Sequence, residues 1–400
     1  MNRSLAVIFA AIGLDAVGIG LIFPILPRLI EDVTHAHDVA PYIGVLTALY
    51  AVMQFVFAPV LGALSDRLGR RPVLLISLAG SAVNYGVMAF APSLWLLFLG
   101  RAIAGLTSAN ISVATAYITD ISPEDMRAKR FGMFNAMFGI GFILGPVLGG
   151  VLGDYWLRLP FIAAAVLNAG NLLLALFFLP ESRVPSRARI DLAALNPLRP
   201  MRWVFSMKTL IPVVAIFFIL SATGEVYGVC WALWGNDMFG WNGLWIGLSL
   251  GAFGICQALA QAFLPGPAVR LLGERGAVLT GIALGCAALV SMAFATQGWM
   301  VFVIMPVVAL AGMGTPALQS LATRLVDESR QGQFQGVLAS AMSLASIIGP
   351  LLFSSLYFVV RAPWPGAIWL SAVVVNAIAI PLVLSLRFPP SIAAPAPLKR

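Results

Sequence analysis

Three ionisable side chains lie inside long apolar segments of this chain: Asp15, Arg101 and Glu225. A charge in hydrocarbon is costly, so such residues usually face a polar cavity and mark the path of a substrate or a proton. Of the 400 residues, 60% are hydrophobic and only 10% are charged, which is too little polar surface for a soluble fold. The sequence therefore predicts a membrane protein with functional charges in its interior.

Apolar stretches of about 20 residues, long enough to cross roughly 30 Å of hydrocarbon, recur along the whole chain. The first follows Arg3 and resembles a signal peptide, but it continues to about Leu29 without a small-residue cleavage site, so we expect it to be retained. The predicted fold is all-α, with twelve transmembrane helices at 5–29, 42–63, 73–91, 94–116, 131–152, 159–180, 209–234, 243–264, 276–296, 299–321, 334–358 and 365–386.

Lys and Arg residues are distributed unequally between the predicted loops. With a cytoplasmic N-terminus, twenty of them fall on the cytoplasmic side, three (Arg28, Arg158 and Arg361) fall outside, and Arg101 lies within a span. Because basic residues favour the cytoplasmic side, both termini are predicted to be cytoplasmic. Membrane orientation also accounts for the net charge of +8, so the charge does not indicate a nucleic acid partner.

The stretch 181–208 is the only long polar linker, with three prolines and six basic residues. It divides six predicted spans (1–180) from six others (209–390), which a short tail (391–400) follows. Glycines recur across the linker at one offset of 204 positions: Gly62 and Gly266, Gly69 and Gly273, and Gly145-Pro146 and Gly349-Pro350. This repeat indicates two pseudo-symmetric six-helix halves, a common plan among transporters.

The loop between the second and third spans reads Gly62-Ala-Leu-Ser-Asp66-Arg67-Leu-Gly69-Arg70-Arg71. Glycines allow a tight turn there, and compact charges can hold neighbouring helix ends. The run resembles the signature loop of the major facilitator superfamily. The resemblance implies a cytoplasmic gate that comprises Gly62, Asp66, Gly69, Arg70, Arg71 and Asp120. The second-half copy has Arg270 in place of Asp66, so we expect a weaker latch in that half.

The fifth span reads Gly139-Ile-Gly141-Phe-Ile-Leu-Gly145-Pro146-Val-Leu-Gly149-Gly150. Small residues at this spacing allow close helix packing, which by itself would explain them. The run also resembles the motif that marks antiporters within the superfamily. The candidate antiporter positions are Gly141, Gly145, Pro146 and Gly149.

The resemblance narrows further to the bacterial tetracycline/proton antiporters. It covers nearly the whole chain, and it is specific in the run from Leu14-Asp15 to Pro24 and Pro27, in Ala48-Leu49-Tyr50, and in Gly349-Pro350-Leu-Leu-Phe353. It implies proton-coupled efflux of an amphipathic drug by alternating-access antiport, with tetracycline as the leading candidate. It also implies no cofactor besides the proton gradient, and a substrate that can travel with a divalent cation.

Departures from those antiporters leave the substrate open. They typically carry Asp where this chain has Asn84 and Gly285, and relatives have Gln at the position of Glu225. Part of that family has a His near Gln257, which this chain lacks. Another hydrophobic antibiotic or an endogenous metabolite is therefore an alternative cargo. A proton-coupled nutrient importer is a further alternative, against which the antiporter-like fifth span argues.

Asp15, Arg101 and Glu225 fall on the first, fourth and seventh spans, which line the central cavity in the superfamily. Asp15 lies near mid-membrane, and Arg101 and Glu225 lie at similar depths from the outer face. Burial penalises the charged form of a carboxyl group, and a nearby cation favours it. We therefore expect the three residues to couple transport to protons. The sequence leaves open which carboxylate meets Arg101, and whether that pair is purely structural.

Helical spacing suggests the remaining wall of the cavity. Ser108 and Ser112 share a face with Arg101, and Tyr50 stacks with Gln54. The aromatic stripe around Trp231 would equally suit a lipid-facing or interfacial position. A few polar groups among aromatics suit a flat amphipathic molecule. The expected substrate contacts are Tyr50, Gln54, Asn84, Ser108, Ser112, Gln257, Gln261, Gln319 and Trp231.

The remaining features argue against other classes. The sequence has no nucleophile–base pair and no Gly-rich phosphate loop, so we expect no enzyme. His35 and His37 have no third ligand, and the three cysteines lie in apolar stretches, so we expect neither a metal site nor disulfides. The expected protein is a monomer in the bacterial cytoplasmic membrane, whose partners are a small molecule, protons and lipid.

Overall fold

The computed structural model describes residues 3–36, 38–183, 196, 210–324, 326–327 and 330–386. Every regular element within these residues is an α-helix. Most of the predicted linker 181–208, the tail 391–400 and His37 lie outside the described residues. Twelve helical segments are long and apolar enough to cross a membrane, which confirms the predicted number of spans.

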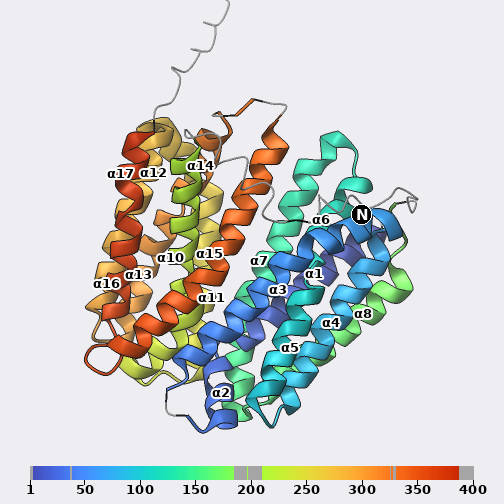
Figure 1. The fold of residues 1–400 in the computed structure, drawn as a ribbon, viewed down its shortest axis with the longest axis horizontal. Helices are drawn as coiled ribbons and strands as arrows, with labels where there is room; N and C mark the ends of the chain where they lie inside the picture. Colours follow the sequence, from blue (N-terminus) through green and yellow to red (C-terminus); the bar gives the residue numbers. More distant parts are fainter. Residues whose placement is uncertain are drawn as a thin grey trace, which may run out of the picture.

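The helices form two groups that lie side by side (Figure 1). The first group comprises α1 (Arg3–Ile22), α2 (Leu26–Thr34), α3 (Ala40–Leu68), α4 (Arg70–Phe90), α5 (Leu94–Thr107), α6 (Asn110–Asp120), α7 (Glu124–Tyr155) and α8 (Leu159–Phe178). The second comprises α10 (Ile211–Phe239), α11 (Gly243–Phe263), α12 (Pro265–Ala293), α13 (Gly298–Ala311), α14 (Gly314–Thr323), α15 (Gln331–Val360), α16 (Ala367–Ala377) and α17 (Ala379–Ser385).

Several predicted spans are interrupted where Pro, Gly or Ser weakens the helix. The first span ends at Ile22, and Pro24 precedes the short α2, which corrects the predicted helix 5–29. The fourth span breaks at Ser108 and Ala109, between α5 and α6. The tenth breaks at Gly312 and Met313, between α13 and α14. These breaks change which face of a span meets the centre of the protein.

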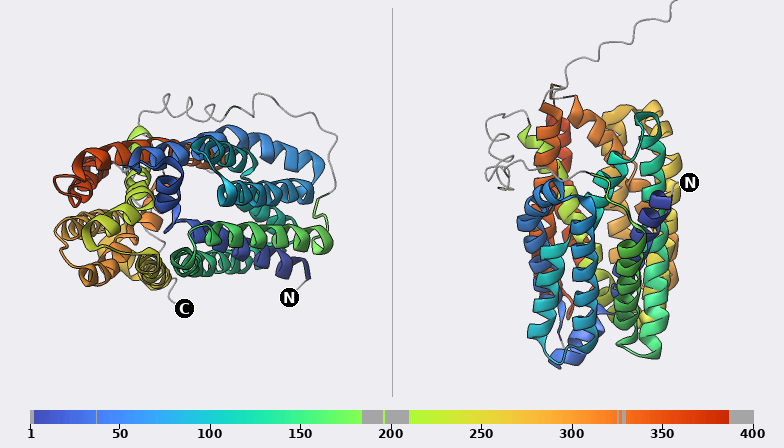
Figure 2. Two further views of the ribbon diagram at one scale, coloured as in Figure 1. Left: turned by 90° about the horizontal axis from the view of Figure 1, so that it is seen from below. Right: turned by 90° about the vertical axis from the view of Figure 1, so that its right-hand side faces the viewer.

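The two halves meet mainly along two helix pairs, α3 with α15 and α7 with α11, and α3 also touches α10. A Cβ atom on Gly44 of α3 would lie 2.9 Å from the carbonyl oxygen of Pro350 and would overlap the side chain of Ser354. On the other side of the molecule, Gly150 and Gly243 are in backbone contact. The halves approach each other at the end that carries α2, and they diverge toward the end at which α1 begins (Figures 1 and 2). We call these the α2 end and the N-terminal end.

Candidate functional site: a central cavity and its gates

A cavity of about 790 Å³ lies between the two halves. Its wall extends from Leu26 and Pro27, near the α2 end, to Pro59, Gly336 and the linker residue Asn196, toward the N-terminal end. A volume of this size suits a drug-sized organic molecule. The predicted site residues that line it are Asp15, Tyr50, Gln54, Asn84, Arg101, Ser108, Ser112 and Glu225.

Asp15 lies on α1 with only 5% of its surface exposed. Its side-chain hydrogen-bond partner is Asn110, at the start of α6. In one continuous helix Asn110 would lie nine residues after Arg101, on the opposite face. The break at Ser108 turns the chain, so that both Ser108 and Asn110 line the cavity. The sequence signal for Asn110 is only its presence as an amide in an apolar run.

The hydroxyl of Ser108 is the centre of a small polar network. The Tyr50 hydroxyl lies 2.7 Å from Ser108 Oγ, and Gln54 Nε2 donates to the same oxygen at 2.9 Å. The Arg101 guanidinium lies over the Tyr50 ring, 5.9 Å from its centroid. This network joins α3 to α5, and it places a polar wall on the first-half side of the cavity.

Arg101 forms no ion pair with Asp15 or Glu225 among the described residues, and its buried Nε has no hydrogen-bond partner there. The side-chain oxygen of Asn84, also in the cavity wall, is likewise buried without a partner. Buried polar groups are usually satisfied in folded proteins. These atoms are therefore available to a molecule that enters the cavity.

Glu225 faces the cavity from α10, on the opposite half. Ser346 of α15 donates a hydrogen bond to Glu225 Oε1 at 2.7 Å. α10 extends to Phe239, so Glu225 lies halfway along its helix and further from the C-terminal end of that helix than the predicted span 209–234 implied. Neither Ser346 nor the cavity residue Tyr85 was a sequence candidate.

Four predicted substrate contacts do not line this cavity. Trp231 is buried in the second-half core, where its Nε1 donates to Ser249 Oγ at 2.9 Å and its ring packs against Trp369. Gln261 donates to the carbonyl of Gly312, and Gln319 donates to Gln335. Gln257 also points toward Gly312. The aromatic stripe thus forms core packing inside the second half, and these polar groups bind one another or the backbone.

The glycines of the fifth span are contact points of α7. Gly141 and Gly145 face α1: a Cβ on Gly141 would lie 2.5 Å from the Gly13 carbonyl oxygen, and one on Gly145 would lie 2.7 Å from Gly20 Cα. Gly149 faces the backbone of Leu21 in the same way. Pro146 contacts both sides: its Cδ lies against Gly20 of α1, and its carbonyl contacts Gly247 of α11. α7 therefore holds the helix of Asp15 on one side and the opposite half on the other.

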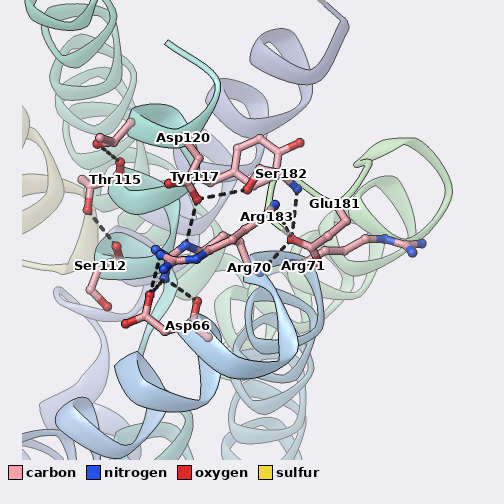
Figure 3. Close-up of polar contacts among 12 residues, drawn as sticks. Asp66, Arg70, Arg71, Ser112, Thr115, Tyr117, Asp120, Glu181, Ser182 and Arg183 are labelled. Atoms are coloured by element: carbon pink, nitrogen blue, oxygen red, sulfur yellow. Dashed lines mark hydrogen bonds and ion pairs between the residues drawn. The ribbon is translucent and has the colours of Figure 1, made fainter. Parts of the chain in front are cut away.

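A charged cluster joins four segments at the N-terminal end of the first half (Figure 3). Arg70 is only 8% exposed; its Nε lies 3.0 Å from Asp120 Oδ2 and its Nη1 lies 2.8 Å from Asp66 Oδ1. Arg183 adds a second cation to Asp66 at 2.8 Å. The predicted gate residues Asp66, Arg70 and Asp120 are thus brought together.

Glu181 completes this cluster, although the sequence did not suggest it. Its carboxylate accepts the backbone N–H groups of Arg70 and Arg71, at 2.8 and 3.2 Å, at the start of α4. Gly69 precedes them with φ +104°, and a Cβ there would overlap the Glu181 carboxylate. A glycine is therefore required at this turn. Gly62, by contrast, has open space where a side chain would lie.

The second half contains a corresponding cluster with the charges exchanged. Arg324, directly after α14, lies 2.8 Å from Glu274 Oε1, to which Ser320 also donates at 2.6 Å. Glu274 follows Gly273, which has φ +72°. Applying the 204-residue offset to Arg70 and Asp120 gives Glu274 and Arg324. Arg270 in place of Asp66 predicted a weaker latch in the second half. That prediction did not include the ion pair between Glu274 and Arg324.

One ion pair and two hydrogen bonds to a carboxylate join the two halves at the α2 end. Arg361, after α15, lies 3.0 Å from Asp38 of the first half and 2.9 Å from Asp237 of its own half. Although burial opposes it, hydrogen bonding to Asp237 and Asp38 holds the pKa of Arg361 above its usual value. Asp154 accepts the backbone N–H groups of Gly243 and Leu244, at the start of α11, and pairs with Arg28.

Two bundles of six spans, a cavity between them, and contacts that close one end together define a membrane transporter of the alternating-access type. The sequence profile of the Major Facilitator Superfamily matches residues 8–245 and 214–400. The chain belongs to the Major Facilitator Superfamily, and within it to the family of the tetracycline resistance proteins. It is a transporter and not an enzyme.

Two relatives show that the chain belongs to the family of the tetracycline resistance proteins. The tetracycline resistance protein of class C from Escherichia coli is 47% identical, over 95% of this chain and 96% of the relative. That of class G from Vibrio anguillarum is 44% identical, over 96% and 98%. The solved structure of the nucleoside transporter NupG shares the fold, with a TM-score of 0.82, 15% identity, and coverage of 96% and 99%.

Proposed function

We propose that the chain exports an amphipathic, tetracycline-like drug from the cytoplasm in exchange for protons. The observation that carries this proposal is the buried carboxyl group of Asp15 in a drug-sized cavity that both halves line. Tetracycline resistance proteins are 47% and 44% identical in sequence to this chain over nearly its full length. Tetracycline is therefore the first compound to test. Another hydrophobic antibiotic or a metabolite is the alternative cargo, because Asn84 and Gly285 replace acids that such antiporters typically carry.

We assign the N-terminal end to the cytoplasm, as the positive-inside distribution indicates. The structure then corresponds to an inward-facing state, with the outer side closed by Arg361 and Asp154. The drug enters between the halves while a carboxyl group releases its proton to the cytoplasm. The halves then rock about the cavity. On the outside the drug leaves and the carboxyl group binds a proton.

Each group of predicted residues takes a separate role in this scheme. Asp15 and Glu225 bind protons, and Arg101 offers a guanidinium to the drug or to a carboxylate. Tyr50, Gln54, Asn84, Ser108 and Ser112 bind the drug, whereas Gln257, Gln261, Gln319 and Trp231 act away from the cavity. Asp66, Arg70 and Asp120 stabilise the cytoplasmic loops of the first half, and Gly141, Gly145, Pro146 and Gly149 set the helix contacts on which rocking depends.

The finer assignments belong to the same proposal. The protein is a monomer in the cytoplasmic membrane of a bacterium, with both termini inside. Residues 1–180 and 209–390 form the rocking halves, the linker 181–208 connects them on the cytoplasmic side, and 391–400 form a tail there. The proton gradient drives transport, and the drug can carry a bound divalent cation through the cavity.

The test combines a resistance assay with transport in membrane vesicles. The chain is expressed in a pump-deficient bacterial host against a panel of antibiotics, with tetracycline among them. Drug uptake is then measured in inverted vesicles with an acidic lumen. We expect the wild type to accumulate the drug, and the Asp15→Asn variant to lose uphill accumulation. Glu124→Gln is the control, because that acid is 90% exposed at the start of α7.

Two results would contradict the proposal. Uphill drug accumulation by the Asp15→Asn protein would remove Asp15 from proton coupling. Proton flow in the same direction as the compound would make the protein an importer. That direction is read from the pH change that the addition of the compound causes in lightly buffered vesicles.

A further inference from the structure

The membrane-spanning core of the second half contains a single acid at mid-depth. Glu225 lies fourteen residues from either end of α10. The second-half helices that pack against α10 are α11, α15, α16 and α17, and none of them contains an Asp, Glu, Lys or Arg. α3 also touches α10, but its Asp66 and Arg67 lie at its far end. Among the described residues of the second half, no cation is therefore placed to neutralise Glu225.

The surroundings of Glu225 are shaped for a carboxyl group. Ser346 donates to its Oε1 at 2.7 Å. A Cβ atom on Gly349 would lie 2.9 Å from both Cβ and Cγ of Glu225, so only glycine leaves room for this side chain. Gly349 belongs to the Gly-Pro repeat, whose first-half copy, Gly145, contacts the backbone of α1 instead. The second half uses the same position to accommodate an acid.

The first half provides the other charged or titratable side chains of the cavity wall: Asp15, Tyr50, Tyr85 and Arg101. Arg101 stacks over Tyr50 and forms no ion pair with either acid within the described residues. Asp15 has Asn110 as its partner, and Glu225 has Ser346. Each acid is thus held by a neutral group of its own half. An acid without a counter-cation must keep contact with water or bind a proton when the cavity closes.

The two acids lie at different depths. The 204-residue offset places Glu225 at the position of Leu21 of α1, six residues beyond Asp15. At 1.5 Å per residue, Glu225 is about 9 Å closer to the α2 end than the equivalent of Asp15. In a cavity open to the outside, protons therefore reach Glu225 first, and in one open to the cytoplasm they leave Asp15 first.

We propose that Glu225 is a second proton-binding site, independent of Asp15, and that export of one drug molecule is coupled to two protons. This inference rests on the proposed function. In the inward-facing state both carboxyl groups release a proton to the cytoplasm as the drug binds. In the outward-facing state both O–H bonds form again from external protons as the drug leaves. Arg101 stays charged throughout and contacts the drug.

The proton-to-drug ratio tests this proposal directly. Purified protein is reconstituted into liposomes with the membrane potential held at zero by potassium and valinomycin. A tetracycline gradient is opposed by a pH difference, and the pH difference that stops net drug flux is measured. A tenfold drug gradient is balanced by about 0.5 pH units for two protons and by about 1 unit for one proton. We expect the wild type at about 0.5 and the Glu225→Gln variant at about 1.

Matched variants identify the role of the carboxyl group. Glu225→Asp keeps the acid, so we expect the two-proton ratio, and Glu124→Gln should leave the ratio unchanged. A wild-type ratio of one proton overturns the second site even if transport is coupled. An unchanged ratio in Glu225→Gln, with a raised KM, would instead make Glu225 a contact for a cationic group of the drug. Wild-type drug flux that does not respond to pH would contradict the proposed function itself.

Discussion

Arg70 and Glu274 occupy equivalent positions in the two halves with opposite charges, and each pairs with the residue fifty positions further along, Asp120 and Arg324. Four residues before them, Asp66 of the first half and Arg270 of the second half also occupy equivalent positions with opposite charges. Because the attraction within a pair does not depend on which partner is positive, both halves keep a charged contact between neighbouring spans. The repeat has preserved the pairing and inverted its sign.

The charges of Glu274 and Arg324 can therefore be exchanged by mutation, which gives the second half the same order of charges as the first. Arg324→Glu places a second acid beside Glu274, and we expect a loss of about fivefold in transport rate, as about 1 kcal/mol of lost pairing would give. The double variant Glu274→Arg with Arg324→Glu should recover most of it. Initial drug uptake in inverted vesicles measures both. A double variant no better than the singles would show that the ion pair itself contributes nothing.

The contact between α1 and α7 should not tolerate a side chain at Gly145. A Cβ there would lie 2.7 Å from Gly20 Cα and from the Val17 carbonyl oxygen, so Gly145→Val must push the helices apart, at a cost of at least about 2 kcal/mol. Gly139→Val is the matched control, because no atom lies within 4 Å of its Cβ position. The apparent unfolding temperature in detergent compares them. Equal temperatures would contradict the close contact.

Arg361 should control how often the outer side opens, because it bridges Asp38 and Asp237 across the halves. We expect Arg361→Ala to shift the population toward the outward-facing state by about three- to tenfold, since a partly buried pair to charged groups contributes about 1 kcal/mol. Arg158→Ala is the control, because Arg158 binds Asp32, Ala89 and Ala91 within one half. Fluorescence energy transfer between labels on the outer ends of the two halves measures the population. An equal shift in both variants would contradict the bridge.

Acids introduced at positions 84 and 285 should have unequal effects. Asn84 lines the cavity, so Asn84→Asp adds a charge beside the drug and should change KM by about tenfold. Gly285 is outside that lining, and its Cβ position lies 3.5 Å from Ala311 and from Asn376. Gly285→Asp should therefore lower the unfolding temperature while the KM of the remaining folded protein stays the same. Drug uptake kinetics and thermal unfolding separate the two, and a changed KM in Gly285→Asp would contradict this placement.

The sequence predicted the spans and the first-half loop cluster well, because both depend on local patterns. Hydrophobic length identifies a span wherever it occurs. Asp66 and Arg70 lie four residues apart on one turn, and Asp120 ends the span that packs beside them. The three buried charges also reach one cavity, since the spans that carry them face the centre in both halves.

The polar partners could not be predicted, because they depend on where helices break. A continuous fourth span hides Asn110, whereas the break at Ser108 exposes it to Asp15. Gln261 and Trp231 were predicted from spacing on their own helices, and spacing does not reveal which neighbour a helix face meets. Glu181 contacts α4 from more than a hundred positions away, and no local pattern marks it.

The contact of α7 with α11 includes close backbone approaches, where Gly150 meets Gly243 and Pro146 meets Gly247, and α11 presents glycines rather than large side chains to Ile143 and Val147 of α7. Bulky side chains that interdigitate would fix one angle between the halves. A helix face of glycines, such as that of α11, can instead turn against its neighbour with little change in buried area. We expect the halves to turn along this contact during transport, and a larger side chain in place of any of its glycines to slow the turnover of the transporter.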